Sequence, residues 1–160
     1  MTIAVGDKLP NTPLVKATPD GPDQVDSETF FAGRKVALFA VPGAFTPTCS
    51  AKHLPGYVER EAELKAKGVD EIACISVNDA FVMGAWSQAT NAAAITMLAD
   101  GNGDFARAVG LEQDSSPYGM GKRSQRYSMI VDDGVVTALN VEGPGEFRVS
   151  SADHLLGTMS

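Results

Sequence analysis

The chain has 160 residues, enough for one domain with a sizeable hydrophobic core that needs no disulfide to hold it together. Its net charge is −7 and it has no basic cluster, which argues against a nucleic-acid interface and against binding to an anionic membrane surface. Two cysteines and two histidines are too few for a disulfide scaffold or a metal cluster, so we expect no metal and no other cofactor.

The first part of the chain predicts little regular structure. Residues 1–34 are punctuated by prolines and glycines, which favours a hairpin-like lead-in with at most short strands, and residues 27–31 predict one helical turn. Residues 1–10 lack the charged start and apolar core of a signal peptide, and no run approaches the roughly 18 apolar residues of a membrane span. We therefore expect a cytosolic protein with no membrane segment.

The stretch PGAFTPTC, residues 42–49, follows a continuous apolar run at 35–41 that is typical of a strand buried on both faces. A helical pattern begins at about Thr46, which places Cys49 in a first helical turn, where free N–H groups and the helix dipole favour a thiolate. The Thr46 hydroxyl, three residues earlier, can donate to the sulfur or to a molecule bound beside it. A single cysteine is more often a small buried hydrophobe, so a reactive role depends on its neighbours.

The helical pattern continues to Leu54, should kink at Pro55, resumes over 57–67 and ends at Gly68. The later predicted elements are a buried strand at 72–77, a helix at 79–90 with Asn78 as its N-cap, a short strand at 96–99, a brief helix at 105–109, a loop at 111–125, a hairpin of strands 127–131 and 135–141 around Asp133-Gly134, and a short helix at 151–156. This alternation predicts one α/β domain over residues 1–160, with a mixed central sheet flanked by helices.

Residues 42–49, together with SAKHLPGYV at 50–58, resemble the signature of the peroxiredoxins, specifically the type II (fifth-subfamily) branch. The similarity continues through CISVNDAFVM at 74–83, RYSMIVDDG at 126–134 and LNVE at 139–142, and so covers nearly the whole chain. The resemblance implies a thioredoxin-like fold and a peroxidase that reduces hydrogen peroxide and organic hydroperoxides, with a role in antioxidant defence and redox homeostasis.

The resemblance also implies roles for particular residues. Cys49 attacks one peroxide oxygen while the other leaves as hydroxide or alkoxide, so the site needs a deprotonated sulfur and donors aimed at the oxygens. The family's active-site arginine falls at Arg126, whose charge would favour the thiolate and whose planar fork can hold both sulfur and peroxide. The other residues expected at the site are Thr46, Pro42 as a shield for the sulfur, and Gly43 and Thr48 as substrate contacts. His53 is expected to be a packed or capping residue without a catalytic role.

A sulfenic acid at Cys49 must be reduced before further peroxide drives it to irreversible acids. Some members of the family use a second cysteine near the C-terminus, but residues 148–151 read RVSS here. We interpret Cys74 as a buried core residue, with a disulfide to Cys49 as the less favoured alternative. We therefore expect a one-cysteine cycle in which an external thiol, glutathione with glutaredoxin or else thioredoxin, reduces Cys49.

Two other functions remain open at this point. A thiol-disulfide oxidoreductase has little support, because Lys52 occupies the second position of a Cys-x-x-Cys pair. A redox sensor or holdase that responds to oxidation of Cys49 stays compatible with the sequence. The resemblance further implies a homodimer, and we expect its interface around Phe45, Phe81 and Trp86.

Overall fold

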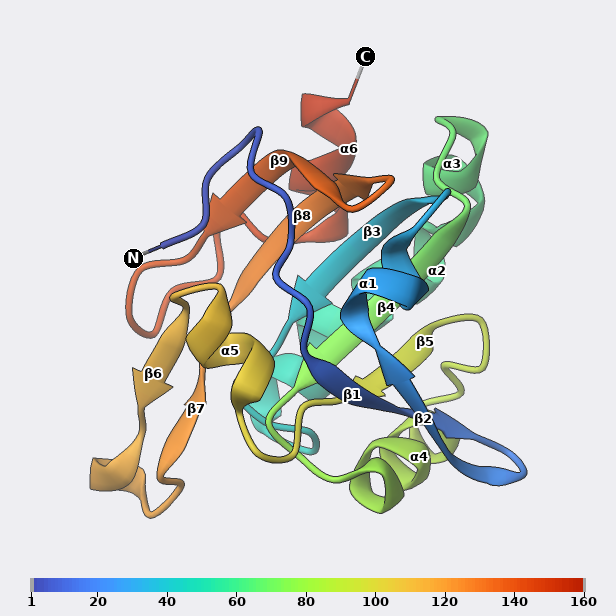
Figure 1. Cartoon of the computed structure of the whole chain (residues 1–160). Coiled ribbons are helices and arrows are strands. Elements are labelled where there is room, and N and C mark those ends of the chain that lie inside the picture. The colour runs from blue at the N-terminus through green and yellow to red at the C-terminus, as the bar shows by residue number, and fades with distance from the viewer. Residues whose placement is uncertain (1, 160) are drawn as a thin grey trace.

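The computed structural model describes residues 2–159. Its main feature is a seven-stranded sheet, in which neighbouring strands follow the order β2-β1-β5-β4-β3-β8-β9 (Figure 1). The strands of this sheet are β1 (Pro13–Thr18), β2 (Gly21–Asp26), β3 (Lys35–Ala40), β4 (Glu71–Ser76), β5 (Thr96–Ala99), β8 (Tyr127–Asp132) and β9 (Val135–Val141). The helices are α1 (Ser27–Phe31), α2 (Leu54–Glu59), α3 (Glu61–Ala66), α4 (Ala80–Ala89), α5 (Asp104–Ala108) and α6 (Ala152–Thr158), with a π-helix at Cys49–His53 and a 3₁₀ turn at Ser116–Tyr118.

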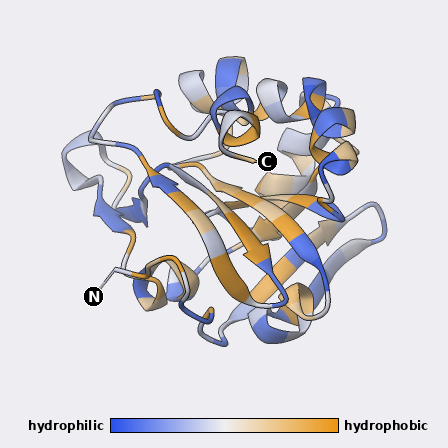
Figure 2. Cartoon of the chain, turned by 90° about the horizontal axis from the view of Figure 1, so that it is seen from above, coloured by the Kyte–Doolittle hydropathy of each residue, from blue (hydrophilic) through white to orange (hydrophobic). Residues whose placement is uncertain are grey.

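The sheet is mixed, as the sequence predicts. Strands β3, β4 and β5 run parallel, whereas β1 and β8 pair antiparallel with β5 and β3. Hydrophobic residues fill the middle strands, and hydrophilic residues concentrate on the helices and loops around them (Figure 2). The continuous apolar character of β3 follows from this position, because a central parallel strand is covered on both faces.

Two hydrophobic clusters cover the two faces of the sheet. The first contains Cys49, Tyr57 and Trp86, and so brings together the π-helix, α2 and α4. The second contains Phe31 of α1 and Phe105 of α5. The reactive-cysteine candidate therefore belongs to one of the two main cores of the protein, not to a surface loop.

The predicted kink at Pro55 takes a different form. The Leu54 N–H bonds to the carbonyl of Cys49, five residues earlier, so the turn before the proline widens into a π-helix. A proline lacks an N–H and its ring crowds the preceding turn of an α-helix, and a wider turn relieves that crowding. A second break follows at Arg60, which has φ −100° and ψ 10° and separates α2 from α3.

Two predictions of local structure were wrong. The N-cap of α4 is Asp79, whose carboxylate accepts the Val82 N–H at 2.8 Å, because the side chain of Asn78 is already bonded to the Ala44 N–H at 2.9 Å. The expected loop at 111–125 contains two short strands, β6 (Glu112–Asp114) and β7 (Lys122–Ser124), which pair antiparallel and project from the main sheet (Figure 1). Strands of three residues are too short to produce a detectable alternation.

Candidate active site

Cys49 lies at the carboxyl end of β3, three residues into the helical segment that begins at Pro47. Its side chain is fully buried. The first intrahelical bond joins the Ser50 N–H to the Thr46 carbonyl at 2.9 Å, so the N–H groups of Thr48 and Cys49 belong to the unpaired first turn. These donors and the helix dipole give the sulfur a positively polarised surrounding on its helical side.

Arg126 supplies a charged donor on the other side of the sulfur. Its Nη2 donates to Cys49 Sγ at 3.0 Å. The sheet accounts for this meeting, because Ala40 at the end of β3 pairs with Tyr127 at the start of β8. Arg126 directly precedes β8, and the loop after β3 leads to the helical segment of Cys49, so the strand pairing brings the two residues together although they lie 77 residues apart in the sequence. A guanidinium in contact with sulfur stabilises the thiolate over the thiol.

His53 holds the guanidinium in place, a role that the sequence interpretation missed. Arg126 Nη1 lies 2.8 Å from His53 Nδ1, and the opposite ring nitrogen, Nε2, lies 3.0 Å from the carbonyl oxygen of Ser150. A carbonyl can only accept and a guanidinium can only donate, so the ring proton is on Nε2 and the lone pair of Nδ1 faces Arg126. Burial, followed by the charge of Arg126, lowers the pKa of His53 to about 3, so the ring is neutral at physiological pH.

The loop from Pro42 to Thr46 folds back on itself beside the sulfur. The Thr46 hydroxyl donates to the carbonyl of Gly43 at 2.7 Å, so its proton is used inside the loop and its lone pairs remain available to accept from a bound molecule. The expectation was that this hydroxyl donates to the sulfur or to a molecule bound beside it; in the structure it donates to Gly43 instead. Phe45 adopts a left-handed conformation with φ 65°, which is uncommon for a non-glycine residue and marks a tightly constrained turn.

A cleft of about 480 Å³ adjoins the site and is lined by Arg126, the residue that contacts the sulfur. Its lining residues include Pro42, Thr48 and Arg126, together with Tyr118 from the turn between β6 and β7. Gly43, expected as a substrate contact, is not among the lining residues, and a Cβ at this position would lie 3.2 Å from both the Met120 side chain and the Thr46 methyl. The glycine therefore permits close packing behind the cleft.

Trp86 is buried beneath the π-helix, not exposed as the dimer prediction required. Its indole N–H donates to Ser50 Oγ at 2.9 Å, which joins α4 to the residue after Cys49. An indole N–H needs a partner when it is buried, and the helix-start position of Ser50 provides one. The expected participation of Trp86 in an interface was wrong for this reason.

Cys74 lies in β4, in the same hydrophobic cluster as Cys49, and its side chain is also fully buried. Both thiols are free. Burial, with the nearby Cys49 as a second cause, raises the pKa of the Cys74 thiol well above its usual value. Cys74 is thus kept in its protonated, unreactive form.

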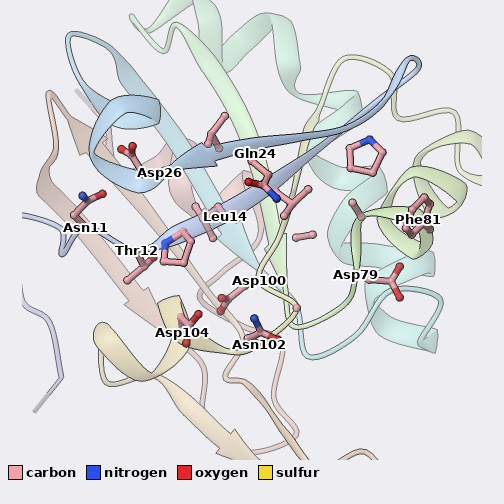
Figure 3. A pocket seen from close by; sticks show the side chains of 17 residues that line it. Asn11, Thr12, Leu14, Gln24, Asp26, Asp79, Phe81, Asp100, Asn102 and Asp104 are labelled. Carbon is pink, nitrogen blue, oxygen red and sulfur yellow. The ribbon is translucent and has the colours of Figure 1, made fainter.

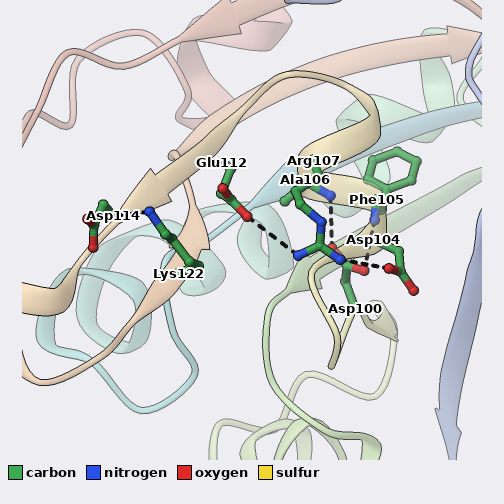
Figure 4. A network of polar contacts seen from close by, with 8 residues as sticks. All are labelled: Asp100, Asp104, Phe105, Ala106, Arg107, Glu112, Asp114 and Lys122. Carbon is green, nitrogen blue, oxygen red and sulfur yellow. Dashed lines mark hydrogen bonds and ion pairs between the residues drawn. The ribbon is translucent and has the colours of Figure 1, made fainter.

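A larger cavity of about 860 Å³ lies between the β1–β2 hairpin, the start of α4 and the turn after β5 (Figure 3). Its carboxylates have structural partners: Asp26 and Asp79 each cap a helix, and Asp100 accepts the Phe105 and Ala106 N–H groups at 3.0 and 2.9 Å (Figure 4). Asp104 pairs with Arg107 at 2.7 Å. Arg126, which donates to Cys49 Sγ, lines the smaller cleft and not this cavity, so the thiol chemistry belongs to the smaller cleft.

Across residues 2–159, no group of three or more metal-ligating side chains comes together. Over the same residues, no helix is long and apolar enough to cross a membrane.

Comparisons with known proteins agree on one family. The family model described as Redoxin matches residues 4–156. The chain is 55% identical to rice "Peroxiredoxin-2E-2, chloroplastic" over 97% of this chain and 72% of that protein, and 49% identical to Arabidopsis thaliana "Peroxiredoxin-2B" over 96% of each. A crystal structure of reduced Prx3 from Vibrio vulnificus in complex with hydrogen peroxide superposes with a TM-score of 0.96 at 56% identity, covering 99% of this chain and 100% of that one. The thioredoxin-like fold expected from the sequence is thereby confirmed.

Proposed function

Because this chain belongs to the peroxiredoxins and is a thiol-dependent peroxidase of antioxidant defence, we propose that it reduces hydrogen peroxide and organic hydroperoxides through a sulfenic acid at Cys49. The observation that carries the proposal is the hydrogen bond of 3.0 Å from Arg126 Nη2 to Cys49 Sγ, because Arg126 also lines a cleft of about 480 Å³ that can hold a small peroxide. No other cysteine in residues 2–159 has a guanidinium as a hydrogen-bond donor.

In the proposed reaction Cys49 is the nucleophile, and the surrounding hydrogen-bond donors stabilise the charge that develops. The Cys49 thiolate attacks one peroxide oxygen, the O–O bond breaks, and the distal oxygen leaves with the electron pair and takes up a proton to become water or an alcohol. Arg126 and the free N–H groups of Thr48 and Cys49 stabilise the negative charge as it moves from sulfur to oxygen. The lone pairs of Thr46 accept from the peroxide O–H and orient it for attack. Pro42 at the wall of the cleft keeps bulk water from the sulfur.

Recycling is proposed to use an external thiol, glutathione with glutaredoxin or else thioredoxin. Residues 148–151 read RVSS, so this region near the C-terminus contains no second cysteine to reduce Cys49. Cys74 is buried in β4, so a disulfide between it and Cys49 would require the protein to open locally. A cytosolic location stays a prediction from the sequence alone.

The experiment is a stopped-flow measurement of the reduced protein with hydrogen peroxide and with tert-butyl hydroperoxide, in which dimedone-type reagents trap the sulfenic acid. We expect oxidation several powers of ten faster than a free thiol, and no trapped product in Cys49→Ser. Rapid oxidation that stops after one equivalent with every thiol reductant would instead favour the redox sensor or holdase. Wild-type oxidation as slow as a free thiol would contradict the peroxidase proposal.

We also propose that the chain forms a homodimer through the surface around Phe45 and Phe81. These side chains are 54% and 74% exposed, which is unusual for large apolar residues. They come from neighbouring segments, because the Ala44 N–H donates to Asn78 Oδ1 at 2.9 Å. Two exposed aromatic side chains on these neighbouring segments would bury their surface in a self-complementary contact.

Sedimentation velocity of Phe81→Glu tests the dimer. We expect the variant to sediment as a monomer at micromolar concentration, while Val5→Glu, which changes another exposed apolar residue, keeps the wild-type coefficient. A wild-type protein that is already monomeric in the reduced form would remove the proposal.

A further inference from the structure

Glu142 is a buried carboxylate that the peroxidase chemistry does not use directly. It follows the end of β9 and is 7% exposed. Its oxygens accept the backbone N–H groups of Arg148, Val149 and Ser150, all at 2.8 Å, and the Ser150 hydroxyl at 2.6 Å. The guanidinium of Arg148 is turned away and pairs with Glu146 at 3.1 Å. The carboxylate is therefore neutralised by backbone dipoles and one hydroxyl, and it folds the segment 143–150 around itself.

The segment that Glu142 organises delivers one carbonyl to the active site. Ser150 is fully buried, and its carbonyl accepts from His53 Nε2 at 3.0 Å and from the Tyr57 hydroxyl at 2.9 Å. The N–H and hydroxyl of the same residue are bonded to Glu142. The peptide is thus held on both sides, and the direction of its carbonyl is fixed relative to the imidazole.

The direction of this carbonyl decides which nitrogen of His53 carries the proton. While Ser150 accepts from Nε2–H, Nδ1 must offer its lone pair to Arg126 Nη1 at 2.8 Å, and Nη2 is then aimed at Cys49 Sγ. If the carbonyl turned away, the proton could move to Nδ1, where it would face a guanidinium N–H. Arg126 would lose its acceptor and with it the orientation toward the sulfur.

We propose that Glu142 is a positioning residue for the reactive thiol, acting through Ser150 and the tautomer of His53 on the guanidinium of Arg126. A carboxylate is required because it alone offers lone pairs on both oxygens, and four donors converge on it. Glutamine would turn an NH₂ group toward at least one backbone N–H. This inference rests on the proposed function only where it concerns peroxide turnover, because the reactivity of the Cys49 thiol can be measured by alkylation without peroxide.

The test measures the rate at which iodoacetamide alkylates Cys49 as a function of pH, together with the rate of oxidation by hydrogen peroxide. In Glu142→Gln we expect the midpoint of the alkylation profile to move upward by about one pH unit and peroxide oxidation to slow by about tenfold. Asp153→Asn is the matched control: it removes a carboxylate three residues after Ser150 that is exposed and paired with Arg60 at 2.8 Å, and we expect wild-type profiles.

Two substitutions of His53 test whether Glu142 acts on Arg126 through His53. Asparagine can place its oxygen near the position of Nδ1 and so keep an acceptor for Arg126 while the contact with Ser150 is cut. Glutamine reaches toward Ser150 but leaves Arg126 without Nδ1. We expect His53→Gln to impair alkylation more than His53→Asn, and we expect Glu142→Gln to add less than twofold to the effect of His53→Asn, since the link is already broken.

Several outcomes would overturn the proposal. One is a Glu142→Gln protein that melts earlier but alkylates as wild type does, and another is full additivity with His53→Asn. Should Glu142→Gln fail to fold, Ser150→Ala, which removes one of the four donors, decides the matter: a two- to threefold slower alkylation supports the role and a wild-type rate contradicts it. If wild-type protein did not reduce peroxide rapidly, the proposed function would fail while the alkylation comparison would still decide the role of Glu142.

Discussion

The two cysteines share a hydrophobic cluster and are equally inaccessible, yet their surroundings differ in kind. Cys49 begins a helix and accepts a hydrogen bond from Arg126 at 3.0 Å. Cys74 lies within β4 between Phe39 of β3 and Met97 of β5, and burial raises the pKa of its thiol. Exposure therefore does not separate a reactive thiol from an inert one in this protein. The hydrogen-bond donors make the difference. Donors around Cys49 stabilise a negatively charged sulfur, whereas the apolar surroundings of Cys74 in β4 disfavour that charge.

The most direct test of this difference between the two cysteines is to replace each of them in turn. We expect Cys49→Ser to lower peroxide turnover by about a thousandfold or more, because the nucleophile is lost, and Cys74→Ser to keep turnover within about twofold when glutathione with glutaredoxin or thioredoxin is supplied. Mass spectrometry after alkylation at pH 8 should find Cys49 labelled in the native protein and Cys74 labelled only in denaturant. Loss of turnover in Cys74→Ser with all reductants would contradict the one-cysteine cycle.

The next largest effect should come from the donor that distinguishes the two thiols. Arg126→Lys keeps the positive charge but loses the planar fork that contacts Sγ and His53 together. We expect peroxide oxidation of Cys49 to slow by about a hundredfold. Arg60→Lys, which alters an exposed arginine that pairs with Glu63 and Asp153, should react at the wild-type rate. Equal rates for the two variants would mean that charge in the neighbourhood of the sulfur, without geometry, is sufficient.

A smaller effect is expected at Thr46, which has no counterpart beside Cys74. Thr46→Val keeps the shape of the side chain but removes the hydroxyl that donates to the Gly43 carbonyl and that we propose accepts from the peroxide, and we expect oxidation to slow by about 10- to 100-fold. Thr46→Ser keeps the hydroxyl and should stay within a few-fold of wild type. Stopped-flow traces of both variants provide the measurement, and similar rates for valine and serine would exclude a role for the oxygen.

The last prediction concerns stability and not the reaction rate. The pKa of His53 is lowered to about 3 by burial and by Arg126, whereas a histidine in the unfolded chain titrates near 6.5. Below pH 6.5 the unfolded state binds a proton that the folded state rejects, so the free energy of unfolding should fall by roughly 1.4 kcal/mol per pH unit from this residue as pH decreases toward 3. Denaturant titrations of wild type and His53→Asn at pH 7, 6, 5 and 4 give the difference. Parallel curves for the two proteins would show that His53 does not titrate on unfolding.

The sequence predicts those parts of this molecule that local chemistry dictates. The apolar run before Pro42, the Asp133-Gly134 turn and the position of Cys49 near a helix start each depend on a few adjacent residues, and the structure contains all three. Arg126 was found only through resemblance, because its meeting with Cys49 depends on strand pairing across the sheet. The roles of His53 and Asn78 were not found, since each contacts residues distant in the chain: Ser150 and Arg126 for the first, Ala44 for the second. The prediction that Trp86 lies in an interface was wrong for the same reason, because its contact with Ser50 also joins residues distant in the chain.

The bond from Trp86 to Ser50 has a practical consequence. The chain contains one tryptophan, and its indole contacts the residue directly after Cys49. Its fluorescence emission therefore reports a single place in the molecule, the first turns of the helix that holds the sulfur. Oxidation or rearrangement at Cys49 should change that emission without any attached dye. Each redox state of the unlabelled protein can then be followed in real time by an optical signal that the fold itself provides.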